Sequence, residues 1–330
     1  MLDNVFKPIA NLSIDLDNKW AYLRTAQKPV WQEMPSYLGE VVPRIISHLA
    51  LANMECTVFI VGRDLESTSN AQSIRELHHA GHRIANHSYE HEPWLHIFDE
   101  ERLHKEIVGT HELIANALGV HCVGFRGPGY SDSPKVHSIL EGLGYRYCAS
   151  AFPSCVGPIA RAFYLMKTGL KRDRERKEMF GSFRDAFGNN RPYLLPSKSQ
   201  KLWMLPVTTQ PLSRLPIHFT YLFYLSQFSM GMARLYYRMS LAMCRRLGVP
   251  PSLLLHPLDF LGKEDEPELD FFPGMKLSRA VKLQQLDWFL AHLSKHFRVH
   301  SMEGFLDRWE ANLPQESQST SKPKDPVARS

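Results

Sequence analysis

Apolar runs of strand length alternate with segments of helical periodicity along the first half of the chain. The strand-like runs are "PIANLSID", "CTVFIVG", "HRIANH", "VHCVGFRG" and "YRYCASAF", separated by glycine-containing or polar breaks. Between them, helical patterns occupy about residues 36–53, 71–80, 99–118 and 134–143. Regular alternation of strand and helix is typical of parallel βαβ units. We therefore predict an α/β fold built on a parallel sheet.

The alternation stops between about residues 155 and 250, where the sequence becomes basic, aromatic and helical apart from the strand-like piece "KLWMLPVTT". It resumes with "PSLLLHPLDF", a helical pattern near residues 277–296 and "FRVHSMEGFLDRW". This arrangement predicts one domain over residues 1–312 that contains a helical insertion at about 155–250. Residues 313–330 are polar, contain Pro and Ser, and are predicted to be disordered.

Apolar residues in the insertion follow a single helical stripe, whereas Arg234, Arg238 and Arg245 fall outside it. The stripe consists of Ile217, Tyr221, Tyr224, Leu225, Phe228, Met232, Leu235, Tyr236, Met239 and Met243. Three interpretations stay open: a helix buried against the rest of the domain, a helix lying on a membrane surface, and a membrane span. Residues 215–233 lack Asp, Glu, Lys and Arg over a length that suffices to cross a bilayer, but several polar residues weaken that interpretation.

Composition and charge narrow the classes of function. With 330 residues, 44% of them hydrophobic, the chain can bury a large core. A net charge of +5, interleaved with acidic residues, argues against a nucleic-acid partner but leaves an anionic membrane surface open. The five scattered cysteines indicate reduced core thiols, and the N-terminal segment lacks the pattern of a secretory signal. We therefore expect a cytoplasmic protein, and attachment to the inner face of the membrane stays an alternative. The sequence predicts no oligomeric state.

Two carboxylates end the first strand-like run. Asp15 and Asp17 are two positions apart on a strand, so both side chains point to the same face. Carboxylates this close repel each other unless positive charge lies beside them. Taken alone, the stretch is more simply explained as a solvated strand end or a helix cap.

Two histidines follow the third run, in "ANHSYEHEP". His87 and His91 are four positions apart, and on a helical turn that spacing puts both imidazoles on one face, within reach of one metal ion. Histidine pairs at this spacing also arise by chance. Together with Asp17 they predict a cation site that keeps open positions for water and substrate, which leaves Asp15 free to act as a base.

Further candidates stand at two other strand ends. In "GFRGPGYSDSP", Arg126 is placed to bind Asp15 and keep it ionised, and the turn at Gly129 and Tyr130 offers backbone N–H groups to a developing oxyanion. A structural turn with a surface arginine is the simpler alternative. His256 ends the apolar run "LLLH", where an imidazole suits protonation of a leaving amine, although a lone histidine there is more often a core residue.

Taken in order, these stretches resemble the polysaccharide deacetylases, the NodB-homology group of carbohydrate esterase family 4. The resemblance rests on "SIDLDN", "CTVFIVG", "ANHSYEH", "GFRGPGY" and "LLLHPLD" and covers roughly residues 8–152 and 200–300. It implies a distorted (β/α) barrel of about seven strands that hydrolyses an N-acyl group from an amino sugar. It also implies a divalent metal, with Zn²⁺ favoured over Co²⁺, Ni²⁺ and Mn²⁺.

The resemblance also implies a role for each candidate at its matching position. These roles are general base for Asp15, metal ligand for Asp17, His87 and His91, orientation of the base for Arg126, and general acid for His256. The first motif departs from the common family pattern, because Leu16 separates the two aspartates. The usual fourth motif, with its Asp and Trp, is not recognisable. Which carboxylate tunes His256 therefore stays open, with Asp259 as a candidate.

The composition of the insertion narrows the range of substrate classes. A basic, aromatic segment in a cytoplasmic chain favours a lipid-linked amino sugar, with residues 211–247 touching the membrane. The resemblance implies a polyprenyl-phosphate amino sugar as the preferred substrate, because some members of the family remove formyl or acetyl groups from such sugars. The alternatives are a soluble or polymeric glycan, a small-molecule amide cleaved by the same residues, and a non-catalytic protein that binds glycan or lipid. The complete set of six candidate residues argues against the last.

Overall fold

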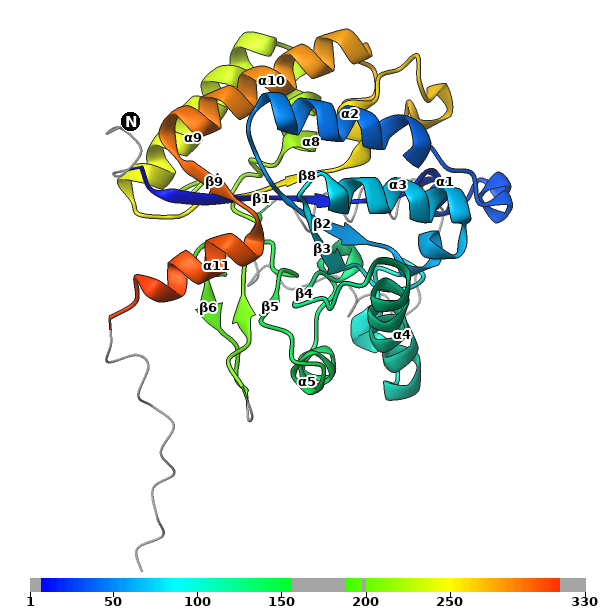
Figure 1. The fold of residues 1–330 in the computed structure, drawn as a ribbon. Coiled ribbons are helices and arrows are strands. Elements are labelled where there is room, and N and C mark those ends of the chain that lie inside the picture. The colour runs from blue at the N-terminus through cyan, green and yellow to red at the C-terminus, as the bar shows by residue number, and fades with distance from the viewer. Residues whose placement is uncertain (1–6, 156–187, 198–199, 315–330) are drawn as a thin grey trace, which may run out of the picture.

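The computed structural model describes residues 7–155, 188–197 and 200–314, drawn in colour in Figure 1. The predicted disordered tail, apart from residues 313–314, and a large part of the insertion lie outside these residues. Within them, one nine-stranded sheet has the order β6-β7-β5-β4-β3-β2-β1-β8, and β9 pairs with β1. The strands are β1 Ile9–Asp15, β2 Thr57–Ile60, β3 Arg83–Asn86, β4 Gly124–Phe125, β5 Tyr147–Cys148, β6 Tyr193–Leu194, β7 Trp203–Met204, β8 Ser252–Leu255 and β9 Arg298–His300.

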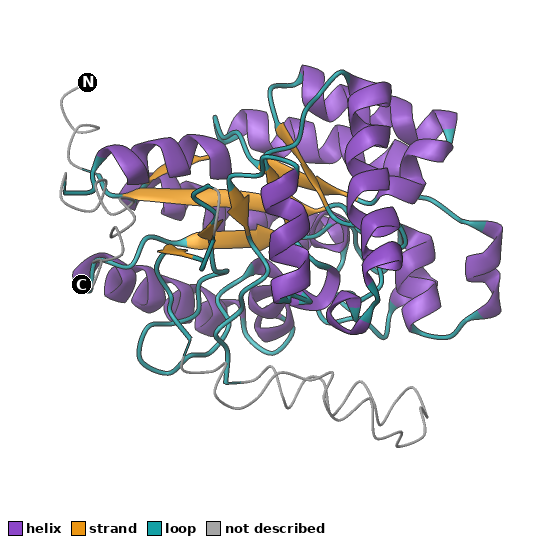
Figure 2. Ribbon diagram, turned by 90° about the horizontal axis from the view of Figure 1, so that it is seen from below, coloured by secondary structure: helices purple, strands orange, loops and turns teal. Residues whose placement is uncertain are grey.

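Seven strands, from β7 to β8 along the sheet, are joined by parallel pairings, whereas β6 pairs antiparallel with β7. Helices follow the strands and cover the sheet on both sides (Figure 2). They are α1 Lys19–Thr25, α2 Leu38–Leu51, α3 Thr68–His79, α4 Glu100–Leu118, α5 Pro134–Gly142, α8 Phe219–Ser226, α9 Met230–Arg246, α10 Arg279–His296 and α11 Met302–Ala311. The predicted α/β class and its parallel sheet of about seven strands are confirmed. The five helices that the sequence predicted outside the insertion are confirmed as well.

The sheet curls until its two ends approach each other. Beyond β7, the backbone N–H of Val207 donates to the carbonyl of Ala151 at 2.8 Å, which continues the pairing with the β5 segment. The next residue, Thr208, donates its N–H to the carbonyl of Ser252 at 2.9 Å, at the start of β8. These bonds link the two ends of the parallel path and give the sheet the shape of a distorted, incomplete barrel.

Alternating side chains of the strands build two apolar layers. Residues such as Leu12 and Ile14 face outward and join the large core beneath the helices. Phe59 and Tyr147 face the concave side, where Phe305 of α11 packs against them. Helix α11 contacts β1 and β9 and fills the inside of the curled sheet (Figure 1). The concave side is therefore a packed core, and room for chemistry remains only at the carboxyl ends of the strands.

The insertion contains two helices where the sequence predicted one continuous stripe. Helix α8 ends at Ser226, and Ser229 caps α9 by accepting the N–H of Met232 at 3.2 Å. The break rotates the two segments relative to each other, so the predicted single stripe was wrong. The buried face of α9 is formed by Ala233, Tyr237, Ser240, Leu241 and Cys244.

Much of the predicted stripe is exposed to solvent instead. Its exposed members are Tyr224, Phe228, Met232, Leu235 and Met239. No helix in the described ranges combines the length and the apolar character needed to cross a bilayer. Of the three interpretations for this segment, partial burial against the domain is observed, and contact with a membrane surface stays a prediction.

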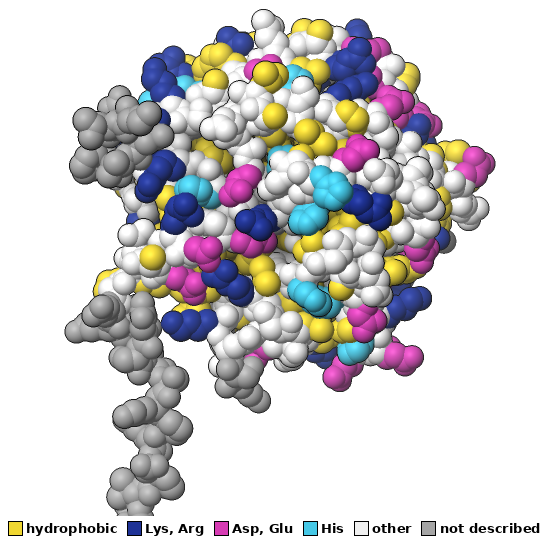
Figure 3. All heavy atoms as spheres, viewed as in Figure 1, with side chains coloured by type: hydrophobic (Ala, Val, Ile, Leu, Met, Phe, Trp, Pro, Cys, Tyr) yellow, Lys and Arg dark blue, Asp and Glu magenta, His cyan; other side chains and the backbone are white. Residues whose placement is uncertain are grey.

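Other surfaces and the thiols follow the expected pattern. On the face drawn in Figure 3, Lys and Arg side chains are interspersed with Asp and Glu. Cys56, Cys122, Cys148 and Cys244 are buried, as predicted for core thiols, whereas Cys155 is partly exposed. All five are free.

Packing on the concave side of the sheet leaves no room for a side chain at Gly124. A Cβ atom on Gly124 would lie 1.9 Å from Cζ of Tyr147, whereas a Cβ on Gly109 in α4 would meet no atom within 4 Å. We expect Gly124→Ala to lower the free energy of unfolding by about 1–3 kcal/mol through overpacking. Gly109→Ala is the matched control and should stabilise slightly, by up to about 1 kcal/mol, because alanine favours helix. Denaturant unfolding of both variants measures the difference, and equal stability would contradict the packing described here.

Candidate active site

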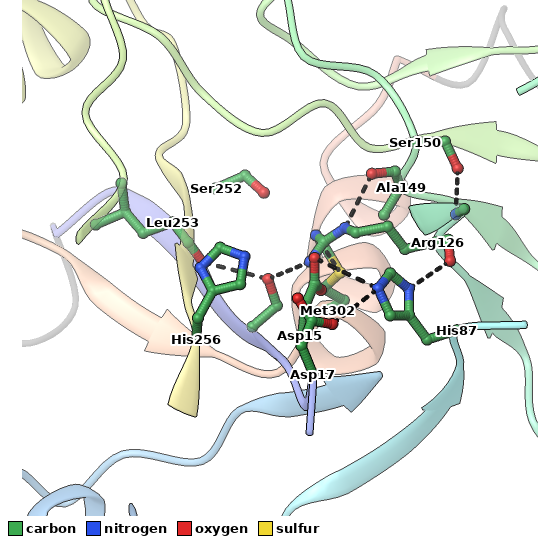
Figure 4. A network of polar contacts seen from close by, with 12 residues as sticks. Asp15, Asp17, His87, Arg126, Ala149, Ser150, Ser252, Leu253, His256 and Met302 are labelled. Atoms are coloured by element: carbon green, nitrogen blue, oxygen red, sulfur yellow. Dashed lines mark hydrogen bonds and ion pairs between the residues drawn. The ribbon is translucent and has the colours of Figure 1, made fainter. Parts of the chain in front are cut away.

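Parallel register places the candidate residues in one row at the carboxyl ends of four strands. The paired positions just before this row are Ile14 with Leu255, Ile60 with Asn86, and Asn86 with Phe125. The next residues along β1, β3, β4 and β8 are Asp15, His87, Arg126 and His256. Because β2 and β8 flank β1 on opposite sides, His87 and His256 lie on opposite sides of the Asp15 carboxylate (Figure 4).

Asp15 is held by a fully buried arginine. Nη1 of Arg126 donates to Oδ1 of Asp15 at 2.5 Å and to the hydroxyl of Ser13 at 3.1 Å. Nε of the same guanidinium donates to the carbonyl of Ala149 at 3.1 Å, and its plane lies 4.2 Å from the centre of the Phe59 ring. Oδ2 of Asp15 faces the histidine side of the site, 3.9 Å from Nε2 of His87. One carboxylate oxygen is thus fixed by Arg126, and the other lies on the side of His87.

Asp17, His87 and His91 converge as a potential metal site. Nε2 of His91 lies 3.0 Å and Nε2 of His87 lies 3.4 Å from Oδ1 of Asp17, an oxygen for which no hydrogen bond of good geometry is found. Nδ1 of His87 lies 2.7 Å from the carbonyl of Arg126, so a neutral His87 carries its proton there and turns the Nε2 lone pair toward Asp17. Imidazole lone pairs that face a buried carboxylate oxygen repel it unless a cation lies between them. The donor set of one carboxylate and two imidazoles suits a divalent metal.

The charge state of Asp17 fits the same site. Burial raises the pKa of the Asp17 carboxyl, but the interactions of this group with His91 and His87 outweigh that effect. The pKa is held well below its usual range, so Asp17 is ionised at neutral pH, as a metal ligand must be. The phenols of Tyr22 and Tyr37 close the site behind it: Oη of Tyr22 lies 3.4 Å from Oδ2 of Asp17, and Oη of Tyr37 donates to the backbone carbonyl of Asp17.

The two histidines meet through a turn, not through a helix. Residues 87–94 follow β3 as a loop in which Ser88 and His91 adopt positive φ of 63° and 53°. Non-glycine residues rarely adopt this conformation, and such strain concentrates at functional sites. The predicted four-residue spacing therefore brought the imidazoles together, but the helical reason given for it was wrong.

The turn after Arg126 is shaped by glycine and strain. A Cβ on Gly127 would lie 2.0 Å from the carbonyl oxygen of Ser131, and Gly129 and Tyr130 have φ of 59° and 61°. The N–H of Tyr130 donates to the carbonyl of Gly127 at 2.9 Å within this turn. Of the two predicted oxyanion donors, Tyr130 is already engaged in the turn, so Gly129 is the better candidate.

His256 is surrounded by groups from the insertion and from its own turn. Nδ1 lies 3.1 Å from the hydroxyl of Thr220, which lies 3.2 Å from Oδ1 of Asp259. Oδ2 of Asp259 accepts the backbone N–H of His256 at 2.8 Å. Asp259 therefore reaches the backbone of His256 directly and its ring through Thr220. Burial raises the pKa of Asp259, against the opposing effect of His256 and Lys282.

Aromatic residues form a wall beside this histidine. Tyr130 and Phe152 stack with ring centres 4.9 Å apart, Phe152 lies 5.5 Å from His218, and His218 lies 6.0 Å from His256. His218 is buried, and burial, reinforced by the charges of His256 and Arg126, holds its pKa well below the usual range. The wall therefore offers apolar and neutral polar contacts rather than charge.

Sequence reasoning missed Ser13, Phe152, His218 and Thr220. A signal for the last two was present, because His218 and Thr220 are polar residues that interrupt the apolar stretch before and within α8. The prediction from sequence used these polar residues only as an argument against a membrane span. Their roles depend on how α8 lies against β8, which no local pattern reveals.

A second group, formed by Asp132, His137 and Cys148, also places three ligand-type atoms together. Here Oδ1 of Asp132 lies 2.8 Å from Nε2 of His137, so the two side chains pair with each other. The Cys148 thiol donates to Ser150 at 3.1 Å, and burial raises its pKa well above the usual range. This group is satisfied internally and does not contact the row of candidate residues.

Comparison with known proteins agrees with this geometry. Residues 27–148 match the family model described as polysaccharide deacetylase. Over these residues the chain is similar to the polysaccharide deacetylase family. Over 93 residues it is 30% identical to a peptidoglycan-N-acetylglucosamine deacetylase from Bacillus cereus, a match that covers 28% of this chain and 32% of that protein. The match thus spans about a third of the length of that curated relative.

Solved structures extend the likeness of fold to nearly the whole chain. A Mycobacterium smegmatis protein, provisionally described as a polysaccharide deacetylase, aligns with a TM-score of 0.59 at 20% identity over 96% of this chain and 99% of that chain. Puue allantoinase aligns with a TM-score of 0.55 at 13% identity over 93% of this chain and 91% of that chain. At these identities the structures show the shared fold, the NodB-like barrel.

The matched family range contains only part of the site. His87, His91 and Arg126 lie within residues 27–148, whereas Asp15, Asp17 and His256 lie outside it. The curled sheet brings the two sets together, because β1 and β8 are neighbours of β2. The structure therefore brings all six candidate residues to one edge of the sheet, although the matched range contains only three of them.

Removing one candidate ligand tests the metal site. We expect Asp17→Ala to bind Zn²⁺ at least about 100-fold more weakly, because one of three protein ligands is lost. Asp132→Ala, in the second group, should keep wild-type affinity. Metal analysis of the purified proteins and calorimetric titration with Zn²⁺ give the comparison. If Asp132→Ala lost the metal and Asp17→Ala kept it, the assignment of the site would be wrong.

Proposed function

We propose that this deacetylase hydrolyses an N-acyl group, acetyl or formyl, from an amino sugar. The observation that carries the proposal is the convergence of two units at one edge of the sheet. One is a carboxylate held by a buried arginine, Asp15 with Arg126, and the other is the Asp17, His87 and His91 group. Amide hydrolysis needs a base for water, a positive site for the carbonyl oxygen and an acid for the leaving amine.

The residues of the chain divide these tasks. Arg126 fixes Oδ1 of Asp15, so Oδ2 is the oxygen that takes a proton from the attacking water. The N–H of Gly129 faces the developing oxyanion. His256, on the other side of Asp15, protonates the departing nitrogen, and the product amine leaves with that proton.

A divalent cation supplies Lewis acidity toward the carbonyl and the water when it is bound by Asp17, His87 and His91. Zn²⁺ is the favoured ion, because an imidazole-rich set of three protein ligands suits it, with Co²⁺, Ni²⁺ and Mn²⁺ as alternatives. Arg126 contributes here as well, since its carbonyl lies 2.7 Å from Nδ1 of His87 and orients that ring.

Asp15→Asn separates catalysis from metal binding. It removes the proton acceptor and keeps the shape of the side chain, so we expect turnover to fall by about 10²- to 10⁴-fold with the metal retained. The assay is mass spectrometry of N-acylated amino sugars, both lipid-linked and soluble, to detect loss of one acyl group. Circular dichroism and metal content check that the variant is folded. Full activity in Asp15→Asn would contradict the proposed base.

We further propose that the substrate is linked to a lipid and that the insertion lies on an anionic membrane surface. Residues 186–258 contain no Asp or Glu and eight Lys or Arg residues. On the described part of this segment, exposed apolar side chains accompany the cations. They are Leu194, Leu212, Leu215, Tyr224, Phe228, Met230, Met232, Leu235, Met239 and Leu247. Apolar side chains rimmed by arginine favour the interface of an anionic bilayer.

Helix α8 connects this surface with the site. Thr220 in its first turn touches His256, whereas Tyr224 in its second turn and Phe228 just beyond its end are exposed. A sugar held at His256 could therefore extend its lipid along the outer end of α8. This arrangement supports a protein at the cytoplasmic face of a membrane that acts on a cell-envelope glycan precursor.

Membrane contact has a direct test in the exposed residues. Phe228 and Met232 are 70% and 57% exposed, and their replacement by Ser should weaken binding to phosphatidylglycerol vesicles at least about tenfold, because buried apolar area is lost. Leu51→Ser in α2, at a position 78% exposed outside the insertion, is the control and should bind like the wild type. Co-sedimentation with vesicles measures both.

Other results would redirect the substrate assignment. If the wild type ignores anionic vesicles and deacylates soluble oligosaccharides as well as lipid-linked sugars, the lipid proposal is wrong and the deacetylase proposal stands. If it cleaves only small cyclic or linear amides, the same residues serve a different substrate. Absence of both metal and turnover would favour a binding protein without catalysis.

A further inference from the structure

The hydroxyl of Thr220 stands between the ring of His256 and a buried carboxylate. Its oxygen lies 3.1 Å from Nδ1 of His256 and 3.2 Å from Oδ1 of Asp259. Thr220 and Asp259 are both buried, so water does not compete for these contacts. A hydroxyl can accept one hydrogen bond while it donates another. The hydroxyl of Thr220 can therefore accept from the ring of His256 and donate to the carboxylate of Asp259.

We propose that Thr220 is a positioning residue that relays the charge of Asp259 to His256, and this inference rests on the proposed deacylation. Nδ1–H of His256 donates to the threonine oxygen, and the threonine O–H donates to Asp259. With Nδ1 committed, Nε2 is the nitrogen that carries the transferable proton. After that proton passes to the leaving amine, the neutral ring keeps its proton on Nδ1.

The carboxylate end of the relay is anchored independently of Thr220. Oδ2 of Asp259 accepts the N–H of His256 at 2.8 Å. The buried ammonium of Lys282 donates to the carbonyls of Leu258 and Leu261 at 2.6 and 2.9 Å, on either side of Asp259 in the sequence. These bonds hold the 3₁₀ turn Pro257–Phe260, so loss of the threonine hydroxyl removes the relay without releasing the carboxylate.

The relay also explains a departure from the family pattern. The usual fourth motif is not recognisable in this sequence, so the family resemblance names no carboxylate for His256. Here a threonine from helix α8 in the insertion reaches His256 and connects it to Asp259, three residues further along the chain. The insertion thereby contributes to the orientation of the proposed acid.

Two substitutions at Thr220 test the relay. Thr220→Val keeps the shape and removes the hydroxyl, whereas Thr220→Ser keeps the hydroxyl. For an N-acetyl amino sugar, we expect Thr220→Val to lower kcat about 10- to 100-fold with little change in KM, and Thr220→Ser to stay within about threefold of the wild type. For 4-nitrophenyl acetate, whose leaving group needs no proton, both variants should match the wild type.

The leaving-group comparison distinguishes the relay from a structural role. A general disturbance of the site would slow the amide and the ester together, and that result would overturn the proposal. So would wild-type amide turnover in Thr220→Val, or equal losses in the valine and serine variants. His256→Ala, measured in parallel, tests the proposed acid itself: full amide activity there would contradict the proposed function.

A spectroscopic readout does not depend on activity. In the full chain labelled with ¹⁵N-histidine, we expect neutral His256 to carry its proton on Nδ1 in the wild type and in Thr220→Ser. In Thr220→Val the population should move toward the Nε2–H form. Spectra of His256→Gln assign the signals. An unchanged tautomer in Thr220→Val would overturn the relay even if the protein proved to have a different substrate.

Discussion

The buried ion pair of Arg126 and Asp15 is the interaction on which the rest of the site depends. A guanidinium without access to water is costly unless every donor direction finds a partner. Ser13 of β1 accepts from Nη1, Ala149, which follows β5, accepts from Nε, and Nη2 lies 3.9 Å from Sδ of Met302. Phe59 of β2 covers the plane. The pair thus ties four strands together. It also leaves one oxygen of Asp15 unconstrained, which is the condition for a base beside a cation.

The same arginine links the proposed base to the candidate metal site. Its carbonyl orients His87, and its side chain orients Asp15, so one residue places both halves of the site. On the other side of Asp15, the orientation of His256 comes from the insertion through Thr220. The helix that carries Thr220 also leads to exposed apolar residues. In the proposed function, proton transfer and recognition of the lipid therefore share one short element, α8.

Strand ends were predictable from sequence because a parallel sheet puts all of them at one edge. The alternation of runs located β1 to β5 and β8, and the polar residue after each run marked the candidates Asp15, His87, Arg126 and His256. Predictions failed where the same residue spacing was compatible with more than one backbone conformation. His87 and His91 meet through a strained turn at Ser88 and His91, and the apolar stripe is divided at Ser229.

The sequence by itself determined the α/β class, the parallel sheet and the chemical types available at its carboxyl edge, because periodicity and residue identity are local properties. Only the tertiary structure decided which atoms meet. Register between β1 and β8 set His256 beside Asp15, and curling of the sheet buried Arg126. The packing of α8 brought Thr220 between His256 and Asp259. Contacts between residues far apart in the chain depend on the closing of the fold, and no local pattern encodes them.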